Sequence, residues 1–164
     1  KEYVSQLAAR QKKFIENLIA QLDKTIIAVG TTSLRTLESL FWMGVKASIN
    51  PQIKELNISQ WEVYEEPLLN TCFSTKESLT ALLNWLVNNK QERLFTQSQI
   101  LIAPGYRFKV ANAIITNFHQ PQSTLLLLVA AAIGNEWHKV YEYALQNDFR
   151  FLSYGDGSLL FIKE

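Results

Sequence analysis

Short apolar segments that end in polar turns and lead into helical patterns constrain the fold of this sequence most strongly. Thr25–Gly30 (TIIAVG) is a β-branched apolar run that ends in glycine, which is typical of a buried strand. Thr31–Gly44 begins with hydroxyl side chains suited to a helix N-terminus, repeats large apolar residues at helical spacing and closes on glycine. This order of strand, polar turn and helix predicts an α/β fold.

The same order recurs later in the chain. Asn112–Thr116 (NAIIT) predicts another buried strand, and Leu125–Ile133 predicts a buried helix after a polar bend at Pro121. A further helix is expected over Glu136–Gln146. Strands that alternate with helices favour a largely parallel sheet flanked by helices, and such sheets bind ligands in the crevice at the carboxyl ends of their strands.

Other segments carry weaker patterns. Ser74 and Glu77 have the spacing of a capping box, so a helix is expected to begin there and to run through Leu86. An amphipathic helix of about five turns is expected from Val4 to Leu22, and an irregular stretch with a turn at Asn50-Pro51 is expected over Lys46–Gln60. Single strands are expected over Trp61–Glu65 and over Ser98–Pro104. Two strands around a glycine-rich turn are expected over Phe149–Ile162.

Composition limits the functional classes. The 164 residues are 48% hydrophobic, which predicts one globular domain over 1–164 with a sizeable core. The 16 basic and 15 acidic residues give a net charge of +1, so the bulk charge argues neither for nor against a polyanionic partner. Cys72 is the only cysteine and is expected to be buried. With only two histidines beside it, the sequence offers no disulfide framework and no Cys/His set for zinc.

Membrane and targeting patterns are not found in the sequence. The longest apolar run, Leu125–Ile133, is far shorter than the roughly 20 residues of a membrane-spanning helix. No signal-peptide pattern is present, so we expect a cytoplasmic protein with no membrane partner. The chain starts at Lys1 without a methionine and enters a periodic pattern at once, which we interpret as a portion of a longer protein.

The turn after the first strand is one candidate site. Thr31, Thr32 and Ser33 lie where free backbone N–H groups and the positive end of the helix dipole favour an anion. Arg35 follows, with a forked pair of donors for a carboxylate or phosphate. Ordinary helix capping beside a surface arginine also explains these residues. Neither a GxGxxG nor a Walker glycine pattern is present, which counts against an ordinary nucleotide cradle.

The turn after the later strand is the second candidate site. Asn117, His119, Ser123 and Thr124 gather between that strand and the buried helix. Ser123 or Thr124 can cap the helix that starts with Leu125. At the carboxyl edge of the sheet, His119 can act as a general acid or base near neutral pH, or it is a hydrogen-bonded structural residue.

A third cluster lies in a glycine-rich turn near the end of the sequence. Tyr154 and Asp156 flank glycine within the string SYGDG. A hairpin turn explains the glycines and the aspartate without any function, and a binding site at the same position is the alternative.

Four blocks of sequence, in a fixed order, resemble the signature of one family. They are AVGTTSLRTLES (28–39), APGYRF (103–108), ITNFHQPQSTLLLLV (115–129) and YALQNDFRFLSYGDGSLLF (143–161). Long ungapped strings in one order are hard to match by chance. The sequence is similar to the S-adenosylmethionine:tRNA ribosyltransferase-isomerases of queuosine biosynthesis.

The resemblance implies a fold and a reaction. Members of that family are longer, so the chain resembles their C-terminal portion, the α/β part without the β-barrel subdomain. The implied reaction transfers and isomerises the ribosyl moiety of S-adenosylmethionine onto 7-aminomethyl-7-deazaguanine at the tRNA wobble position, giving epoxyqueuosine in tRNA plus adenine and methionine. S-adenosylmethionine is then a co-substrate and the modified tRNA a partner. No prosthetic group and no metal are expected.

Roles for the candidate residues follow from the resemblance. The reaction needs a base for a proton next to the sulfonium, a donor for the departing adenine and an anion site for the methionine carboxylate. We expect His119 to transfer protons. The residues expected to bind S-adenosylmethionine are Thr31, Thr32, Ser33, Arg35, Asn117, Ser123 and Thr124, and those expected to bind the nucleotide substrate are Tyr106, Phe118, Tyr154 and Asp156. For the rings of Phe118 and Tyr106, core packing is the alternative.

Two other functions fit the same residues. One is a different α/β transferase or hydrolase that uses His119 with Asp156 and turns over without S-adenosylmethionine. The other is a noncatalytic tRNA-binding or interaction domain, which binds tRNA with a salt-dependent affinity and ignores that co-substrate.

Overall fold

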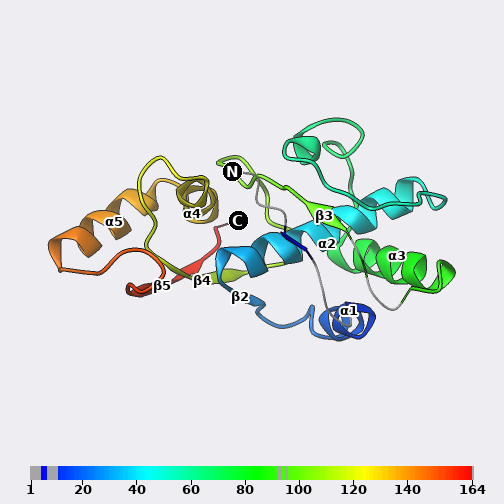
Figure 1. Cartoon of the computed structure of the whole chain (residues 1–164), viewed down its shortest axis with the longest axis horizontal. Coiled ribbons are helices and arrows are strands. Elements are labelled where there is room, and N and C mark those ends of the chain that lie inside the picture. The colour runs from blue at the N-terminus through cyan, green and yellow to red at the C-terminus, as the bar shows by residue number, and fades with distance from the viewer. Residues whose placement is uncertain (1–4, 7–10, 92–93, 95, 164) are drawn as a thin grey trace. The chain divides into compact units, whose positions relative to one another are not determined.

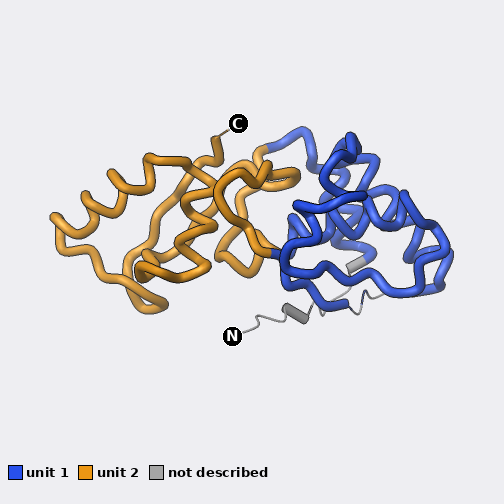
Figure 2. The backbone as a smooth tube through the Cα atoms, turned by 90° about the horizontal axis from the view of Figure 1, so that it is seen from above, with its two compact units in different colours: residues 1–24, 36–100 blue, residues 25–35, 101–164 orange. Residues whose placement is uncertain are grey.

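Two units make up the part of the chain that the structure, a computed structural model, describes: residues 5–6, 11–91, 94 and 96–163 (Figure 1). The first unit comprises Lys1–Lys24 and Thr36–Ile100, and the second comprises Thr25–Arg35 and Leu101–Glu164 (Figure 2). The division falls inside helix α2 (Thr31–Ile49), whose first residues belong to the second unit. The single domain expected over 1–164 stays a prediction.

Helices form most of the first unit. Besides the larger part of α2, its elements are β1 (Ser5–Gln6), α1 (Gln11–Ala20), the 3₁₀ helix η1 (Glu62–Tyr64), α3 (Thr75–Asn88) and β3 (Gln97–Ser98). The predicted capping box starts α3, because the Ser74 hydroxyl accepts the Glu77 N–H at 3.2 Å and the Glu77 carboxylate accepts the Ser74 N–H at 2.8 Å. Strands β1 and β3 pair antiparallel.

The first helix and the strand expected over Trp61–Glu65 differ from prediction. The helix begins at Gln11, and Ser5–Gln6 is a strand instead. Val4 and Leu7, which we placed in that helix, lie outside the described residues. The segment at Trp61–Glu65 forms η1, because the Glu62 carboxylate accepts the Ser59 N–H at 2.9 Å and ties the chain into a local turn.

Two further details of the first unit correct the sequence-based expectations. Helix α2 passes through Gly44 and ends at Ile49, next to the turn predicted at Asn50-Pro51. Gly44 lies where α3 approaches, and a Cβ at this position would overlap the backbone oxygen of Ser78. This glycine therefore permits close helix packing and does not stop the helix. Cys72 is exposed, contrary to expectation, since it lies in the irregular segment before α3.

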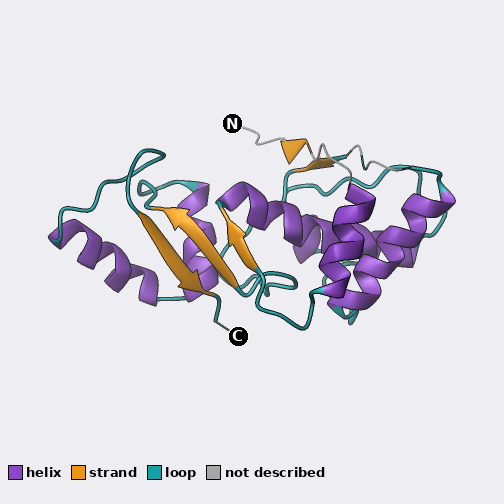
Figure 3. Cartoon of the chain, turned by 90° about the horizontal axis from the view of Figure 1, so that it is seen from below, coloured by secondary structure: helices purple, strands orange, loops and turns teal. Residues whose placement is uncertain are grey.

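A three-stranded sheet organises the second unit. Strand β4 (Ala113–Asn117) lies in the middle, with β2 (Ile27–Val29) parallel on one side and β5 (Gly157–Phe161) antiparallel on the other. Helices α4 (Thr124–Ile133) and α5 (Glu136–Gln146) follow β4, and α4 contacts both α5 and β5 (Figure 3). The α/β class and the helices that flank the sheet are confirmed, and α5 has the predicted bounds.

The sheet has fewer strands than expected. Of Ser98–Pro104, only Ser98 lies in a strand, β3, which belongs to the small sheet of the first unit. Within Phe149–Ile162 only β5 forms, because the Leu152 N–H donates to the Phe118 carbonyl at 2.9 Å and the rings of Phe149 and Phe151 pack on Phe118. One strand pair is therefore parallel and one antiparallel.

The two faces of this sheet differ in burial. Ala28, Ile114 and Leu160 are buried on one face. The other face is apolar and open, and its exposed side chains are Ile27, Val29, Ile115, Leu159 and Phe161. Val29 and Phe161 are 67% and 62% exposed. An uncovered apolar surface of this kind is unusual on a water-soluble domain. Among the described helices, none is long and apolar enough to cross a membrane.

Candidate active site

The carboxyl ends of β2 and β4 bring the first two candidate clusters to one edge of the sheet. Val29 pairs with Ile115, and the Gly30 N–H donates to the Ile115 carbonyl at 2.8 Å. Gly30 has a φ of +88°, which glycine adopts at little cost, and the chain then turns directly into α2. Thr31 is half-buried at the start of α2, while Thr32 and Ser33 are exposed and Arg35 is half-buried.

His119 is held by two hydrogen bonds beyond the end of β4. Its ring nitrogen Nε2 lies 2.9 Å from the hydroxyl of Thr116, which is a buried residue of β4. Its backbone N–H donates to the hydroxyl of Tyr141 on α5 at 3.0 Å. Within the described part of the chain, Nδ1 has no hydrogen-bond partner. The imidazole therefore keeps one nitrogen for a ligand while the other fixes its orientation.

Burial sets the protonation state of this imidazole. Desolvation lowers the pKa of His119 below its usual value of 6.5, so the neutral ring predominates at pH 7. The Tyr141 pKa is raised, mainly by burial, so its hydroxyl stays protonated and can accept the His119 N–H. A half-buried neutral imidazole is a competent proton acceptor, and once protonated it is a stronger acid than an exposed histidine.

The glycine-rich turn closes on the same end of β4. The Asn117 amide donates to the backbone oxygens of Gly155 and Asp156, at 3.1 and 3.4 Å. The Asp156 carboxylate accepts the Arg150 backbone N–H at 2.8 Å and forms an ion pair with the Arg150 guanidinium at 3.2 Å. These bonds hold the pKa of Asp156 below its usual value. Asn117 and Asp156 therefore fix the loop, whereas the Tyr154 ring is 97% exposed.

Phe118 and Ser123 have structural contacts in this structure. The Phe118 ring is 3% exposed and lies 5.3 Å from Tyr141 and 5.4 Å from Phe151 between ring centroids. The packing interpretation of Phe118 accounts for these contacts. Ser123 caps α4: its hydroxyl accepts the Leu126 N–H at 3.2 Å and donates to the Gln120 carbonyl at 2.9 Å. Thr124 is the first residue of the helix and is exposed.

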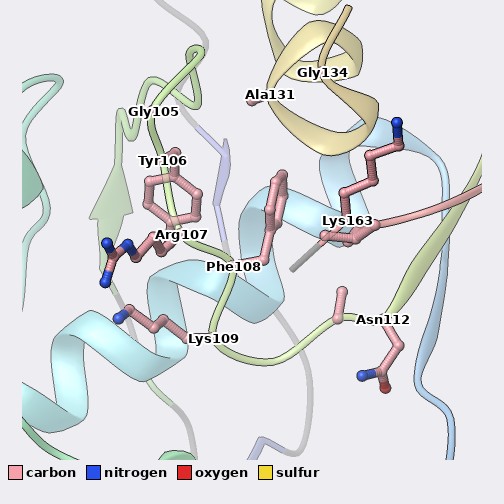
Figure 4. A pocket seen from close by; sticks show the side chains of 11 residues that line it. Gly105, Tyr106, Arg107, Phe108, Lys109, Asn112, Ala131, Gly134 and Lys163 are labelled. Atoms are coloured by element: carbon pink, nitrogen blue, oxygen red, sulfur yellow. The ribbon is translucent and has the colours of Figure 1, made fainter. Parts of the chain in front are cut away.

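Tyr106 lies away from these residues. It is 7% exposed and lines a pocket together with Asn112, which precedes β4, and Lys163, which follows β5 (Figure 4). That pocket lies at the amino end of β4, whereas Asn117 and His119 lie at its carboxyl end. The structure thus brings Asn117 against the glycine-rich turn at the carboxyl end of β4, where His119 and the start of α4 follow in sequence, and it places Tyr106 at the opposite end.

Sequence reasoning missed three residues that support His119 and the loop: Tyr141, Thr116 and Arg150. Tyr141 lies on the buried side of α5 with Ala144, and a buried tyrosine hydroxyl needs a hydrogen-bond partner, which is the one available signal. The sequence does not indicate that this partner is the backbone of His119. Among the described residues, no three His, Cys, Asp or Glu side chains come together in a way that could hold a metal ion.

Comparisons with known proteins identify related sequences and a related structure. A protein-family model described as "Queuosine biosynthesis protein" matches residues 2–160. The S-adenosylmethionine:tRNA ribosyltransferase-isomerase of Rickettsia bellii (strain OSU 85-389) is 34% identical over 150 residues, covering 91% of this chain and 30% of the relative. The protein of the same name from Cereibacter sphaeroides is 54% identical over 65 residues, covering 39% of this chain and 19% of the relative.

The structural comparison agrees with the sequence comparisons. The crystal structure of S-adenosylmethionine tRNA ribosyltransferase from Thermotoga maritima matches with a TM-score of 0.56 and 28% identity, covering 90% of this chain and 38% of that chain. The chain spans less than two fifths of the length of each of these relatives. The family inferred from the four sequence blocks is confirmed, and this chain belongs to the queuosine biosynthesis protein family.

Proposed function

We propose that this chain is part of an S-adenosylmethionine:tRNA ribosyltransferase-isomerase and contributes residues to its active site. The enzyme would transfer and isomerise the ribosyl moiety of S-adenosylmethionine onto 7-aminomethyl-7-deazaguanine at the tRNA wobble position, with adenine and methionine as further products. We also propose that the 164 residues work as one α/β region, corresponding to the C-terminal portion of the relatives, and that the enzyme acts in the cytoplasm.

The position of His119 is the observation that carries this proposal. Its neutral imidazole lies beyond the carboxyl end of β4, next to the strand whose end leads into α2. The reaction needs a base near a positively charged sulfonium. A neutral imidazole with one uncommitted nitrogen meets this requirement, since it can take the proton next to sulfur and later return one to a leaving group.

The N-termini of helices α2 and α4 lie at this same edge of the sheet and suit the anionic end of S-adenosylmethionine. Backbone N–H groups at the start of α2, with Thr31, Thr32 and Ser33, would receive the methionine carboxylate, and Arg35 would add a charge-assisted hydrogen bond. Ser123 and Thr124 would orient the co-substrate from the start of α4.

The remaining candidate residues would act on the nucleotide or through the loop. Asn117 and Asp156 would position the glycine-rich turn, because their side chains already hold it through hydrogen bonds. Tyr154 would offer an exposed ring to the substrate nucleotide. Phe118 would keep the loop in place from the core, and Tyr106 would contact tRNA at a different position.

Adenine release is the direct test of this proposal. The chain is incubated with S-adenosylmethionine and tRNA that carries 7-aminomethyl-7-deazaguanine, and adenine is measured by chromatography. His119→Ala should abolish release, whereas His138→Ala, which changes an exposed histidine on α5, should leave it unchanged. Both variants are checked for folding by circular dichroism.

A chimera covers the case in which the chain needs the rest of its enzyme. The 150 matched residues of the Rickettsia bellii relative are replaced by the corresponding residues of this chain. The proposal is wrong if neither the chain nor a folded chimera releases adenine while the unmodified relative does. Binding of tRNA alone would then favour the noncatalytic alternative, and turnover without S-adenosylmethionine would favour the different transferase or hydrolase.

A further inference from the structure

The pocket at the amino end of β4 is separate from the candidate active site. The loop before β4 forms one of its walls, and residues at the end of α4 and after β5 complete it. Strand β4 has 5 residues and would span about 17 Å at the usual rise per residue. A ligand in this pocket would therefore lie about that distance from His119 and would not take part in chemistry there.

Positive charge is concentrated at this pocket. Arg107, Lys109 and Lys163 are among its lining residues, and none of the described lining residues carries a carboxyl group. The whole chain has nearly equal numbers of basic and acidic residues, 16 and 15, so this local excess departs from the average. Such a patch attracts a polyanion even when the net charge of the protein is close to zero.

Arg107 and Lys163 are the cations that a ligand can reach most easily. Both side chains are exposed. The Lys163 ammonium lies 3.9 Å from one oxygen of Glu136, whose other oxygen lies 3.2 Å from the ammonium of Lys139. Ion pairs this exposed contribute little, so Lys163 can exchange its distant carboxylate for a phosphate at small cost.

An aromatic ring lies between these two cations. Figure 4 shows the ring of Phe108 in the pocket, with the Lys163 side chain on one side and the Arg107 side chain, which extends away from the ring, on the other. Phe108 is half-buried, and its ring packs at a right angle to the buried ring of Tyr106, with 5.2 Å between their centroids. This packing holds the Phe108 ring in place, so that it can serve as a stacking surface.

The combination fits a strand of nucleic acid better than a single small anion. A base stacked on an aromatic ring within a polynucleotide has phosphates on both of its sides, and cations on both sides of the ring match that pattern. The Asn112 side chain accepts the Ile26 N–H at 2.8 Å through its oxygen, and its amide nitrogen remains a donor for a base or a ribose hydroxyl.

We propose that this pocket binds a single-stranded segment of RNA, with one base on Phe108 and the flanking phosphates at Arg107 and Lys163. The inference rests on the proposed function only in choosing RNA as the polymer. The bound segment would belong to the tRNA but would not contain the reacting nucleotide. The pocket would thus add affinity and fix the position of the tRNA on the enzyme.

RNA binding by the chain itself tests this inference. The probe is a fluorescein-labelled single-stranded RNA of about 12 nucleotides, followed by fluorescence anisotropy at several salt concentrations. Arg107→Gln and Lys163→Gln should each weaken binding and reduce the slope of log affinity against log salt by about 0.7 for each phosphate that the variant no longer neutralises. Phe108→Ala should weaken binding roughly tenfold or more with little change in that slope.

Matched variants separate the pocket from the general charge of the surface. Lys76→Gln removes an exposed lysine of α3, and Phe14→Ala removes a partly exposed ring of α1, both outside the pocket. Neither should change the affinity or the salt slope. The inference is overturned if the folded chain does not bind the RNA, if the pocket variants bind like these controls, or if inorganic triphosphate competes as well as RNA and Phe108→Ala has no effect.

A second readout keeps this inference apart from the proposed function. Calorimetric titration with S-adenosylmethionine should be unaffected in Arg107→Gln and Lys163→Gln, because these residues lie away from His119. RNA binding that depends on the pocket, with no adenine released by either the chain or the folded chimera, would support the pocket and contradict the proposed function. Adenine release, together with RNA binding that the pocket variants do not change, would support the proposed function and contradict the RNA-binding role of the pocket.

Discussion

At the scale of single residues, the structure explains how a half-buried histidine, His119, can serve as a proton acceptor. Thr116 holds the Nε2 atom of His119, and Tyr141 holds its backbone N–H. These partners come from β4 and α5, so two elements fix the position of the imidazole. Burial then favours the neutral ring, which is the form that a proton acceptor needs at pH 7.

The lowered pKa of His119 predicts a dependence of stability on pH. Below about pH 6.5 the unfolded chain binds a proton at this residue more readily than the folded chain does. The free energy of unfolding should therefore fall as the pH is lowered from about 6.5 through the folded-state pKa of His119, and this contribution should be fully present above that range. Urea unfolding of the wild type and of His119→Gln between about pH 7 and pH 5 measures the difference. Equal pH dependence in the two proteins would show that His119 is not desolvated.

Tyr141 gives a second prediction at this scale. Tyr141→Phe removes the hydroxyl that accepts the His119 N–H and leaves that donor without its partner. We expect a loss of about 1–3 kcal/mol in the free energy of unfolding. Tyr143→Phe is the matched control, because Tyr143 lies on the same helix but is 60% exposed. Similar urea midpoints for the two variants would mean that the hydrogen bond contributes little.

At the scale of elements, close packing of helices in the first unit depends on Gly44. A methyl group there would overlap the backbone of α3 at Ser78, whose hydroxyl donates to the Phe41 carbonyl on α2. The sequence alone suggested that Gly44 ends the helix, since glycine commonly follows a helix C-terminus. Which role a glycine has depends on the element packed against it, and that element is distant in sequence.

Gly44→Ala tests this packing because two effects oppose each other. Helix propensity favours alanine over glycine by about 1 kcal/mol in a helix interior. The overlap with Ser78 should outweigh this gain and lower the free energy of unfolding by at least about 2 kcal/mol. Asn84→Ala, at an exposed position of α3, should instead be neutral or slightly stabilising. Stabilisation by Gly44→Ala in thermal unfolding would contradict the close approach.

The open apolar face of the sheet in the second unit gives another prediction at this scale. Leu159→Thr and Phe161→Thr should reduce the fluorescence of a hydrophobic dye such as ANS and change the free energy of unfolding by less than about 1 kcal/mol, because both side chains are exposed. Leu160→Thr, on the buried face of the same strand, should cost about 2 kcal/mol or more. Dye binding that is unchanged in the two exposed variants would show that this face does not bind it.

Elements that depend on neighbouring residues could be predicted from the sequence. Elements that depend on pairing with distant segments could not. The capping box at Ser74 and the bounds of α5 follow from neighbouring residues, so the sequence predicted them. Phe149 and Phe151 alternate as in a strand, but their rings pack on Phe118 and no strand forms there. A strand needs a partner with free backbone groups, and the sequence does not show which partner is available.

At the scale of the whole molecule, the candidate active site lies within the second unit. The carboxyl ends of two parallel strands bring α2 and the loop of His119 to one edge, as the α/β pattern predicted. That pattern could not show that Tyr106 lies at the opposite end of β4, nor that Asp156 is paired with Arg150. Both depend on the path of the chain between elements, which composition and periodicity do not encode.

Binding of S-adenosylmethionine to the chain tests the central claim most directly. Isothermal titration calorimetry of the wild type is compared with His119→Ala and Arg35→Ala, each checked for folding, and with His138→Ala as the control. We predict that the wild type and the control bind, and that the other two variants bind more weakly. Equal binding by all four folded proteins, or no binding by either the folded wild type or the folded chimera, would contradict the assignment of the site around His119.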